Sequence, residues 1–200
     1  FEFIILEDKT INAFAAPGGI IGINLGMFLN TEREGELASV MCHELAHLSQ
    51  RHFARSQNRN SPLANALMIL GSIAVAAASR NPEAILIAPA AMQQMSINYT
   101  RSNEKEADRI GFNNLVKAGF DPNDMTMMFQ RMQDKYQNED SEQFSYLMTH
   151  PLPSERLTDM RIRADGLKNN SKNSFRDNMD FYLMQKRAKV WAEKILKEII

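Results

Sequence analysis

The residues with the clearest chemistry are two histidines and a glutamate in the segment Met41–His47, which contains the pattern His-Glu-x-x-His. Residues four apart on an α-helix lie on one face, about 40° apart around the axis and about 6 Å apart along it. His43 and His47 could therefore bind one tetrahedral Zn²⁺, and Glu44 could take a proton from a metal-bound water. A helix that merely carries two surface histidines is the alternative interpretation.

A third histidine ligand on the same pass of chain is excluded by the residues that follow this motif. The extended pattern H-E-x-x-H-x-x-G-x-x-H requires glycine and histidine where this chain has Gln50 and Phe53. His52 would lie about 140° around the helix from His47, away from the metal-facing side. We therefore interpret His52 as a structural or exposed residue.

A second helix offers carboxylates in the segment Asn103–Asp108. Glu104 and Asp108 are four residues apart and share a face, whereas Glu106 points about 200° away from Glu104. We expect Glu104 to be the third ligand and Asp108 to accept a hydrogen bond from the other ring nitrogen of a ligating histidine. An exposed charged helix would explain any one of these residues but not the combination of two helices.

The elements that must position these residues begin with short β-branched and aromatic runs. These runs predict a small antiparallel meander of three strands, Phe3–Leu6, Ile11–Ala15 and Ile20–Asn24. Thr31–Glu34 has the form of a capping box, which predicts a helix that continues to about Arg59. This helix carries the His-Glu-x-x-His pattern.

Helical patterns dominate the rest of the chain. Further helices are predicted over Met95–Ala118, Pro122–Gln137 and Ser154–Leu167, with Asp121 as the N-cap of the second. A helix over residues 179–200 has an apolar stripe made of Phe181, Met184, Ala188, Trp191, Ile195 and Ile199. The sequence therefore predicts an α+β fold, a domain of residues 1–167, a polar linker at 168–178 and a terminal amphipathic helix. That helix either packs back on the domain or begins a helical repeat.

The composition of the chain argues against nucleic-acid binding and against an internal disulfide. Lys and Arg total 23 against 24 Asp and Glu, so the chain lacks the basic field that nucleic-acid binding needs. One cysteine, Cys42, cannot form a disulfide within the chain.

No signal peptide is expected where the chain opens on a strand-like segment. The apolar stretch Leu63–Met92 is interpreted as a helical hairpin, either a lid over a cleft or part of a core, with peripheral membrane contact rather than a membrane span.

Four motifs occur together along the chain, and their combination resembles one known family. They are Ile11–Ala15 (INAFA), His43–His47 (HELAH), Asn103–Asp108 (NEKEAD) and Thr149–Pro151 (THP). In this order they resemble the M48 family of zinc metallopeptidases, nearest to the bacterial periplasmic branch that serves outer-membrane β-barrel assembly. The resemblance covers Phe3–Leu167 and implies a mostly helical, gluzincin-like zincin domain.

The resemblance also implies roles for individual residues. One Zn²⁺ per chain would be held by His43, His47 and Glu104, with Glu44 as the general base and Asp108 as the carboxylate behind the ligands. His150 is implied to reach the metal, where it either stabilises the transition state or occupies the fourth coordination position and holds the enzyme off.

Two further assignments rest on the same resemblance. Arg156 is a candidate for contact with the oxyanion or the substrate, with a surface role as the alternative. The segment Asn12, Ala13 and Phe14 is implied to be the substrate-facing strand, to which an extended peptide would add by backbone pairing.

The implied activity is that of a periplasmic zinc-dependent endopeptidase that hydrolyses misfolded or stalled cell-envelope proteins, with a tetratricopeptide-repeat region after the terminal helix. Its implied partners are unfolded or misassembled proteins and the outer-membrane β-barrel assembly machinery. The alternative is a chaperone or scaffold that retains zinc, works through its helical C-terminal region and has little proteolytic activity. Glu44→Gln would separate the two, because only the enzyme depends on that carboxylate.

Overall fold

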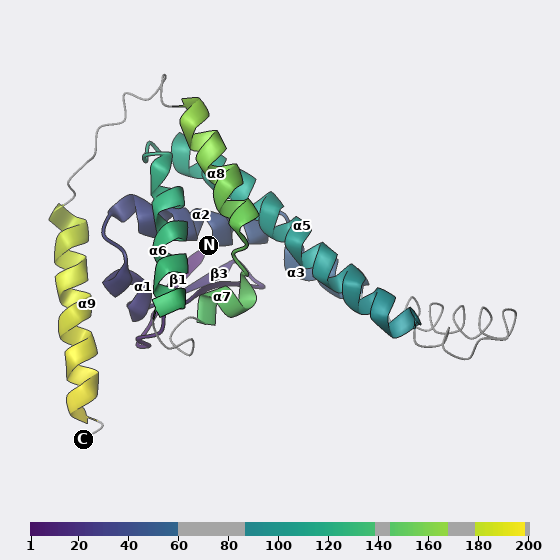
Figure 1. Ribbon diagram of the computed structural model, residues 1–200. Coiled ribbons are helices and arrows are strands. Elements are labelled where there is room, and N and C mark those ends of the chain that lie inside the picture. Colours follow the sequence, from purple (N-terminus) through teal and green to yellow (C-terminus); the bar gives the residue numbers. More distant parts are fainter. Residues whose placement is uncertain (60–86, 139–144, 168–178, 199–200) are drawn as a thin grey trace, which may run out of the picture. The chain divides into compact units, whose positions relative to one another are not determined.

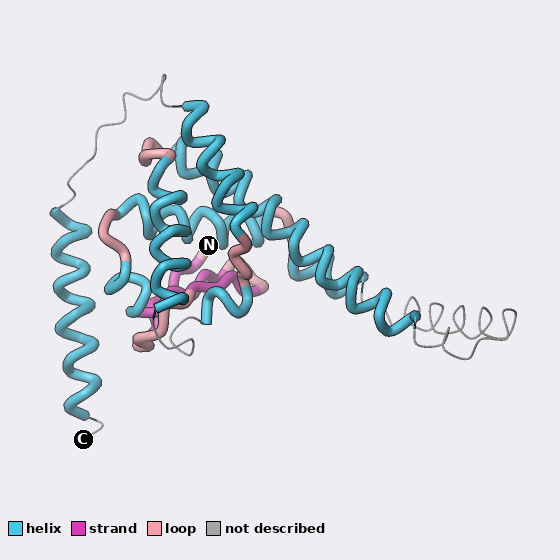
Figure 2. Tube along the Cα trace, in the orientation of Figure 1, coloured by secondary structure: helices cyan, strands magenta, loops and turns pink. Residues whose placement is uncertain are grey.

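The computed structural model describes residues 1–59, 87–138, 145–167 and 179–198 (Figure 1). Three strands open the chain, β1 (Glu2–Leu6), β2 (Ala13–Ala16) and β3 (Ile20–Asn24), and helices make up most of the rest (Figure 2). The helices are α1 (Leu25–Asn30), α2 (Glu34–Ser49), α3 (His52–Arg59), α5 (Ile87–Lys117), α6 (Asn123–Asn138), α7 (Ser145–Thr149), α8 (Ser154–Leu167) and α9 (Met179–Glu198). The predicted α+β class with dominant helices is confirmed. Two compact units are present, Phe1–Ser49 with Glu106–Ile200, and Gln50–Lys105.

The sheet is mixed, so the expected antiparallel meander is wrong for its first strand. The strand order is β1-β3-β2, with β1 parallel and β2 antiparallel to β3. The segment between β1 and β2 crosses the end of β3, where Asp8 accepts a hydrogen bond from the Gly26 amide and Thr10 accepts one from the Asn24 side chain. This crossing places β2 on the far side of β3.

The predicted helix from the capping box to about Arg59 is divided into two helices, α2 and α3, although α3 ends at Arg59 as expected. It is interrupted after Ser49, and Arg51 has a left-handed φ of 54° between α2 and α3. At the start, the carboxylate that accepts the Glu32 amide at 2.7 Å belongs to Glu36, not to Glu34. Helix α2 therefore begins at Glu34 and carries the His-Glu-x-x-His pattern in its second half.

The later helices follow the sequence more closely. Helix α5 begins earlier than predicted and ends near Gly119, which has a φ of 88°. Asp121 accepts the Asn123 amide at 2.8 Å, which confirms its capping role, and α8 has the predicted bounds. Helices α1 and α7 were not predicted. The apolar stretch Leu63–Met92 lies outside the described residues up to residue 86, as does the linker at 168–178, and residues 87–92 belong to α5.

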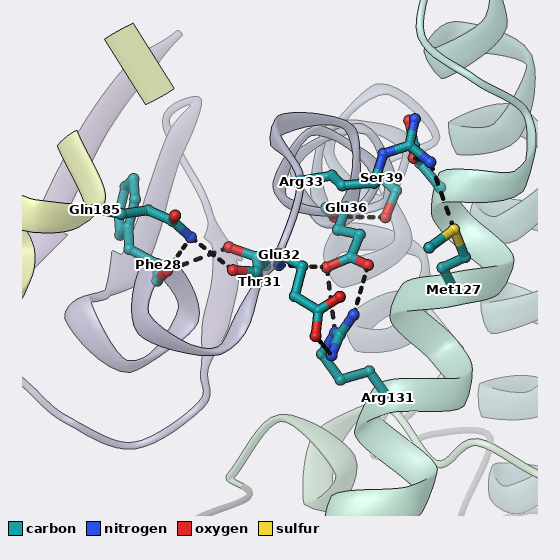
Figure 3. Close-up of polar contacts among 10 residues, drawn as sticks. Phe28, Thr31, Glu32, Arg33, Glu36, Ser39, Met127, Arg131 and Gln185 are labelled. Atoms are coloured by element: carbon teal, nitrogen blue, oxygen red, sulfur yellow. Dashed lines mark hydrogen bonds and ion pairs between the residues drawn. The ribbon is translucent and has the colours of Figure 1, made fainter. Parts of the chain in front are cut away.

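Two hydrophobic clusters support the site. One brings together residues of the sheet, α1, α2, α6 and α9, and the other brings together residues of α5, α6 and α8. In α9, Phe181 and Ala188 are buried in the first cluster, whereas Met184 and Trp191 of the predicted stripe are 44% and 41% exposed. The Gln185 amide nitrogen donates to the carbonyls of Phe28 and Thr31 at 3.0 and 2.6 Å (Figure 3). The terminal helix therefore packs back on this unit.

Candidate metal centre

Helix α2 places His43, Glu44 and His47 as the sequence predicts. His43 and Glu44 are almost fully buried, and His47 lies one turn after His43 on the same face. The Nε2 atoms of the two histidines are 2.9 Å apart, and their ring centroids are 4.7 Å apart. The two imidazoles therefore present the same ring nitrogen to one point.

Helix α5 approaches the backbone of α2 closely at Gly111. A Cβ atom on Gly111 would lie 3.0 Å from the backbone nitrogen of His43 and 3.1 Å from its Cα. One turn earlier on α5, the buried Asp108 carboxylate lies 3.0 Å from Nδ1 of His43. An acceptor at Nδ1 fixes the tautomer and orientation of the ring and leaves Nε2 as the donor atom toward a metal. The sequence pattern predicted Asp108 in this position but gave no role to Gly111.

The charge of Asp108 is maintained by its neighbours. Burial alone would raise the pKa of this carboxyl, but the hydrogen bonds and positive charge of Arg156, with a smaller contribution from His43, lower it below its ordinary value. Asp108 is therefore a carboxylate at neutral pH, which is the form that accepts a hydrogen bond from His43 Nδ1.

Arg156 lies in the interior, so its alternative interpretation as a surface residue is wrong. Its side chain is 3% exposed and lies over the Phe129 ring, with the guanidinium carbon 5.3 Å from the ring centroid. Nε and Nη2 each donate to one oxygen of Asp108 at 2.7 Å, and Nη1 donates to the Pro151 carbonyl at 2.6 Å.

His150 directly follows α7, a short helix that the sequence did not indicate. Its backbone amide donates to the Tyr146 carbonyl at 2.8 Å, and its ring stacks on the Tyr146 ring with centroids 4.6 Å apart. The Tyr146 amide in turn donates to the Ile11 carbonyl at 3.2 Å. Tyr146 is a residue of the site that sequence reasoning missed; its one signal was its position one helical turn before His150.

Four of the sequence-predicted residues form a group that could hold a metal ion. Glu104 lies one turn before Asp108 on the continuous helix α5. His43, His47, Glu104 and His150 each offer one donor atom, and these four atoms lie within 4.8 Å of one another. Glu44 Oε1 is buried and lies 3.6 Å from Nε2 of His150, beyond hydrogen-bonding distance. The arrangement combines three imidazole nitrogens and one carboxylate oxygen with the Glu44 carboxylate beside them.

A comparison with known families identifies this arrangement. Residues 1–164 match Peptidase_M48, the peptidase family M48. The chain belongs to the M48 peptidase family. The expected family membership is thereby confirmed over most of the chain, including every residue of the donor group.

Individual relatives in the family agree with this membership. The chain is 49% identical over 169 residues to a putative beta-barrel assembly-enhancing protease of Vibrio cholerae, covering 82% of this chain and 34% of that protein. It is 39% identical over 197 residues to the beta-barrel assembly-enhancing protease of Escherichia coli, covering 94% of this chain and 39% of that protein. A mitochondrial metalloendopeptidase of Schizosaccharomyces pombe is 29% identical over 157 residues, covering 78% and 44%. The chain thus spans 34–44% of the length of these three relatives.

The remaining residues of interest lie elsewhere in this M48 chain. Ala13 and Phe14 are in the edge strand β2, where Ala13 is fully buried and Phe14 is 39% exposed, and Asn12 immediately precedes it. His52 is buried at the start of α3 and is not a member of the donor group. Burial raises the pKa of the Cys42 thiol to about 11, so it is not a thiolate at neutral pH. Within the described parts of the chain, no helix is both long enough and apolar enough to span a bilayer.

Proposed function

We propose that this chain is the catalytic part of a zinc-dependent endopeptidase that cleaves misfolded or stalled cell-envelope proteins in the periplasm. The observation that carries the proposal is the convergence of His43, His47 and Glu104, with the Glu44 carboxylate buried beside them. Imidazole and carboxylate donors are the set that Zn²⁺ prefers in catalytic sites. A tetrahedral zinc ion with bonds of about 2.0–2.1 Å needs donor atoms roughly 3.3 Å apart, which is close to the 2.9 Å between the two histidine Nε2 atoms.

Zinc held by these three residues would supply a Lewis acid for the scissile carbonyl and lower the pKa of the attacking water. The protein's own contribution is proton transfer. Glu44 accepts the proton of the attacking water and delivers it to the departing amine, a role worth about 10²–10⁴-fold in rate. Asp108 holds the His43 ring in place, since its carboxylate lies at Nδ1 and leaves Nε2 for the metal.

His150 is assigned as the fourth ligand of the resting enzyme. Membership of the donor group and the stack on Tyr146 support this assignment, because together they direct the imidazole toward the point on which the other donors converge. A protein ligand in the fourth position excludes the attacking water, so resting activity is low. His150→Ala should then raise hydrolysis of an unfolded reporter, whereas loss of turnover would assign His150 to transition-state stabilisation.

The edge strand β2 is proposed as the substrate-binding edge, with Asn12, Ala13 and Phe14 along it. Strand β3 occupies one side of β2, and a peptide in extended conformation would pair with the other. Backbone pairing is insensitive to most side chains, which suits the cleavage of unfolded or misassembled proteins. Because similar proteins are named beta-barrel assembly-enhancing proteases, the outer-membrane β-barrel assembly machinery is the proposed partner.

The test is the pair Glu44→Gln and Glu104→Gln, measured for metal content and for hydrolysis of an unfolded protein. Glu44→Gln should keep one zinc per chain and lose at least about 10²-fold in rate, whereas Glu104→Gln should lose the metal. Glu106→Gln, on the same helix as Glu104, is the matched control and should change neither. A Glu44→Gln variant that retains full cellular function would instead favour the zinc-retaining chaperone or scaffold.

A further inference from the structure

One guanidinium group connects two separate parts of the candidate metal centre. Arg156 donates two hydrogen bonds to Asp108, the residue that holds His43, and a third to the carbonyl of Pro151, the residue that follows His150. Asp108 is on α5, Pro151 is in the segment between α7 and α8, and Arg156 is in the first turn of α8. His43 and His150 are thus both connected to Arg156, His43 through the Asp108 carboxylate and His150 through the carbonyl of the next residue.

The contacts of Arg156 require an arginine. A guanidinium is planar and carries five N–H donors in a fixed fork, so it can bind both carboxylate oxygens and a carbonyl at once. The Phe129 ring supports one face of this plane at 5.3 Å. A lysine ammonium could keep the charge next to Asp108 but could not reproduce the two-oxygen contact and the carbonyl contact together.

The same contacts argue against a direct role in the reaction. The three hydrogen bonds of Arg156 described above are directed to Asp108 and Pro151, and the side chain is 3% exposed. A residue that contacts the oxyanion or the substrate must present a donor to the position where the charge develops. Arg156 presents its donors to the protein.

We propose that Arg156 is a positioning residue that fixes the His150 segment relative to His43, so that the two imidazoles are held at the metal as one unit. This inference rests on the proposed zinc site. Its physical basis is two sets of contacts. Arg156 holds the Asp108 carboxylate, which contacts His43 Nδ1, and it also holds the Pro151 carbonyl, which belongs to the backbone next to His150. Loss of the guanidinium fork releases both histidines.

The test is a double-mutant cycle with Arg156→Lys and His150→Ala in the full chain. Zinc affinity is measured by competition with a chromophoric chelator. Arg156→Lys should weaken zinc binding about 10–100-fold, the range for loss of a residue behind the ligands. In the His150→Ala background the same substitution should weaken it at least threefold less, because one of the two sets of contacts no longer leads to a ligand. Arg163→Lys is the control, since Arg163 is on the same helix, pairs with the half-buried Asp159 and should change affinity less than twofold.

A second readout uses the metal-free protein. The His150 amide donates to Tyr146, so its hydrogen-exchange rate reports how firmly this segment is held. Exchange at His150 should be at least tenfold faster in Arg156→Lys than in the wild type and unchanged in Arg163→Lys. If Arg156→Lys does not fold, the neutral pair Asp108→Asn with Arg156→Gln, which leaves no buried charge, enters the same cycle in its place.

The outcomes separate this inference from the proposed function. Effects of Arg156→Lys and His150→Ala on affinity that multiply within twofold, with unchanged exchange at His150, would overturn the inference while the wild type still binds zinc. A wild-type chain that binds no zinc would overturn the proposed function itself.

Discussion

Two buried carboxylates, Glu36 in α2 and Asp108 in α5, each accept two hydrogen bonds from one arginine guanidinium, an arrangement called a fork below. The two forks differ in the groups that surround them. At the start of α2, Arg131 of α6 donates to both oxygens of Glu36 at 3.2 and 3.0 Å (Figure 3). Beside His43 of α2, Arg156 of α8 donates to both oxygens of Asp108 of α5 at 2.7 Å. Glu36 and Asp108 are both almost fully buried.

The two forks differ in what else their members contact. Arg131 is 21% exposed, and its second carboxylate is Glu32, which is 68% exposed. Glu36 also accepts the Glu32 amide, so this fork ties the first turn of α2 to α6. Asp108 instead contacts the ring of His43, which makes the second fork part of the candidate metal centre. The two ion pairs are thus of one type and differ in the third group that the carboxylate touches, which is a backbone amide in one and the His43 ring in the other.

The largest expected contrast is between Asp108→Asn and Glu36→Gln. Asp108→Asn should lower zinc affinity about 10–100-fold, because the acceptor that orients His43 is lost. It should also lower the free energy of unfolding by about 3–5 kcal/mol, since the charge of Arg156 is left buried. Glu36→Gln should lower the free energy of unfolding by only about 1–3 kcal/mol, because Arg131 keeps Glu32. Chelator competition and urea unfolding measure the two quantities.

The comparison would fail in a specific way. Zinc affinity that falls as much in Glu36→Gln as in Asp108→Asn would mean that any loosening of α2 reaches the metal site, and the two forks would then have one role.

The next contrast is in pH dependence, between Asp108 and Asp124, a neighbour of the first fork. Burial, aided by the charges of Asp121 and Glu36 and opposed by Arg33, raises the pKa of Asp124 to about 6. Between pH about 4 and 6 the folded chain binds this proton and the unfolded chain does not, so this group makes the free energy of unfolding fall as pH rises, by up to about 3 kcal/mol. The lowered pKa of Asp108 acts in the opposite direction, giving stability that is lost as pH falls below about 4.

Asp124→Asn isolates the first of these effects. Its free energy of unfolding, measured by urea titration at half-unit steps from pH 4 to 7, should rise relative to the wild type as pH rises and level off above about 6. A difference between the two proteins that is constant across this range would contradict the raised pKa.

The smallest expected contrast concerns two glycines that bring these carboxylates close to α2. A Cβ on Gly35 would lie 1.8 Å from Asp124 Oδ2, a side chain that can rotate away, whereas a Cβ on Gly111 would meet the backbone of His43. Both Gly35→Ala and Gly111→Ala should lower the free energy of unfolding by about 1–3 kcal/mol. Only Gly111→Ala should also weaken zinc binding, and only Gly35→Ala should regain stability when combined with Asp124→Ala. Thermal unfolding and chelator competition on the four variants test this.

The sequence predicted the parts of this molecule that depend on local chemistry. The spacing of His43 and His47, the capping by Asp121 and the bounds of α8 follow from helix geometry and from side chains next to their partners in the chain. The placement of Glu104 and Asp108 on one helical face was predicted for the same reason. The resemblance to M48 then indicated which two helices belong together.

The parts that were missed depend on contacts distant in sequence. The parallel pairing of β1 requires the crossing held by Asn24 and Gly26, and the break at Arg51 has no glycine or proline to mark it. The burial of Arg156 is evident only once α5 and α8 are placed, since its partner is 48 residues away. No periodicity or capping pattern encodes such a contact.

The hydrogen bond from the Tyr146 amide to the Ile11 carbonyl has a mechanical consequence. It joins the residue on which His150 stacks to the residue that leads into β2, so one hydrogen bond connects the His150 segment to the proposed substrate-binding edge. Under the proposed function, a polypeptide that paired with this edge and displaced Ile11 would therefore also move the segment that carries His150.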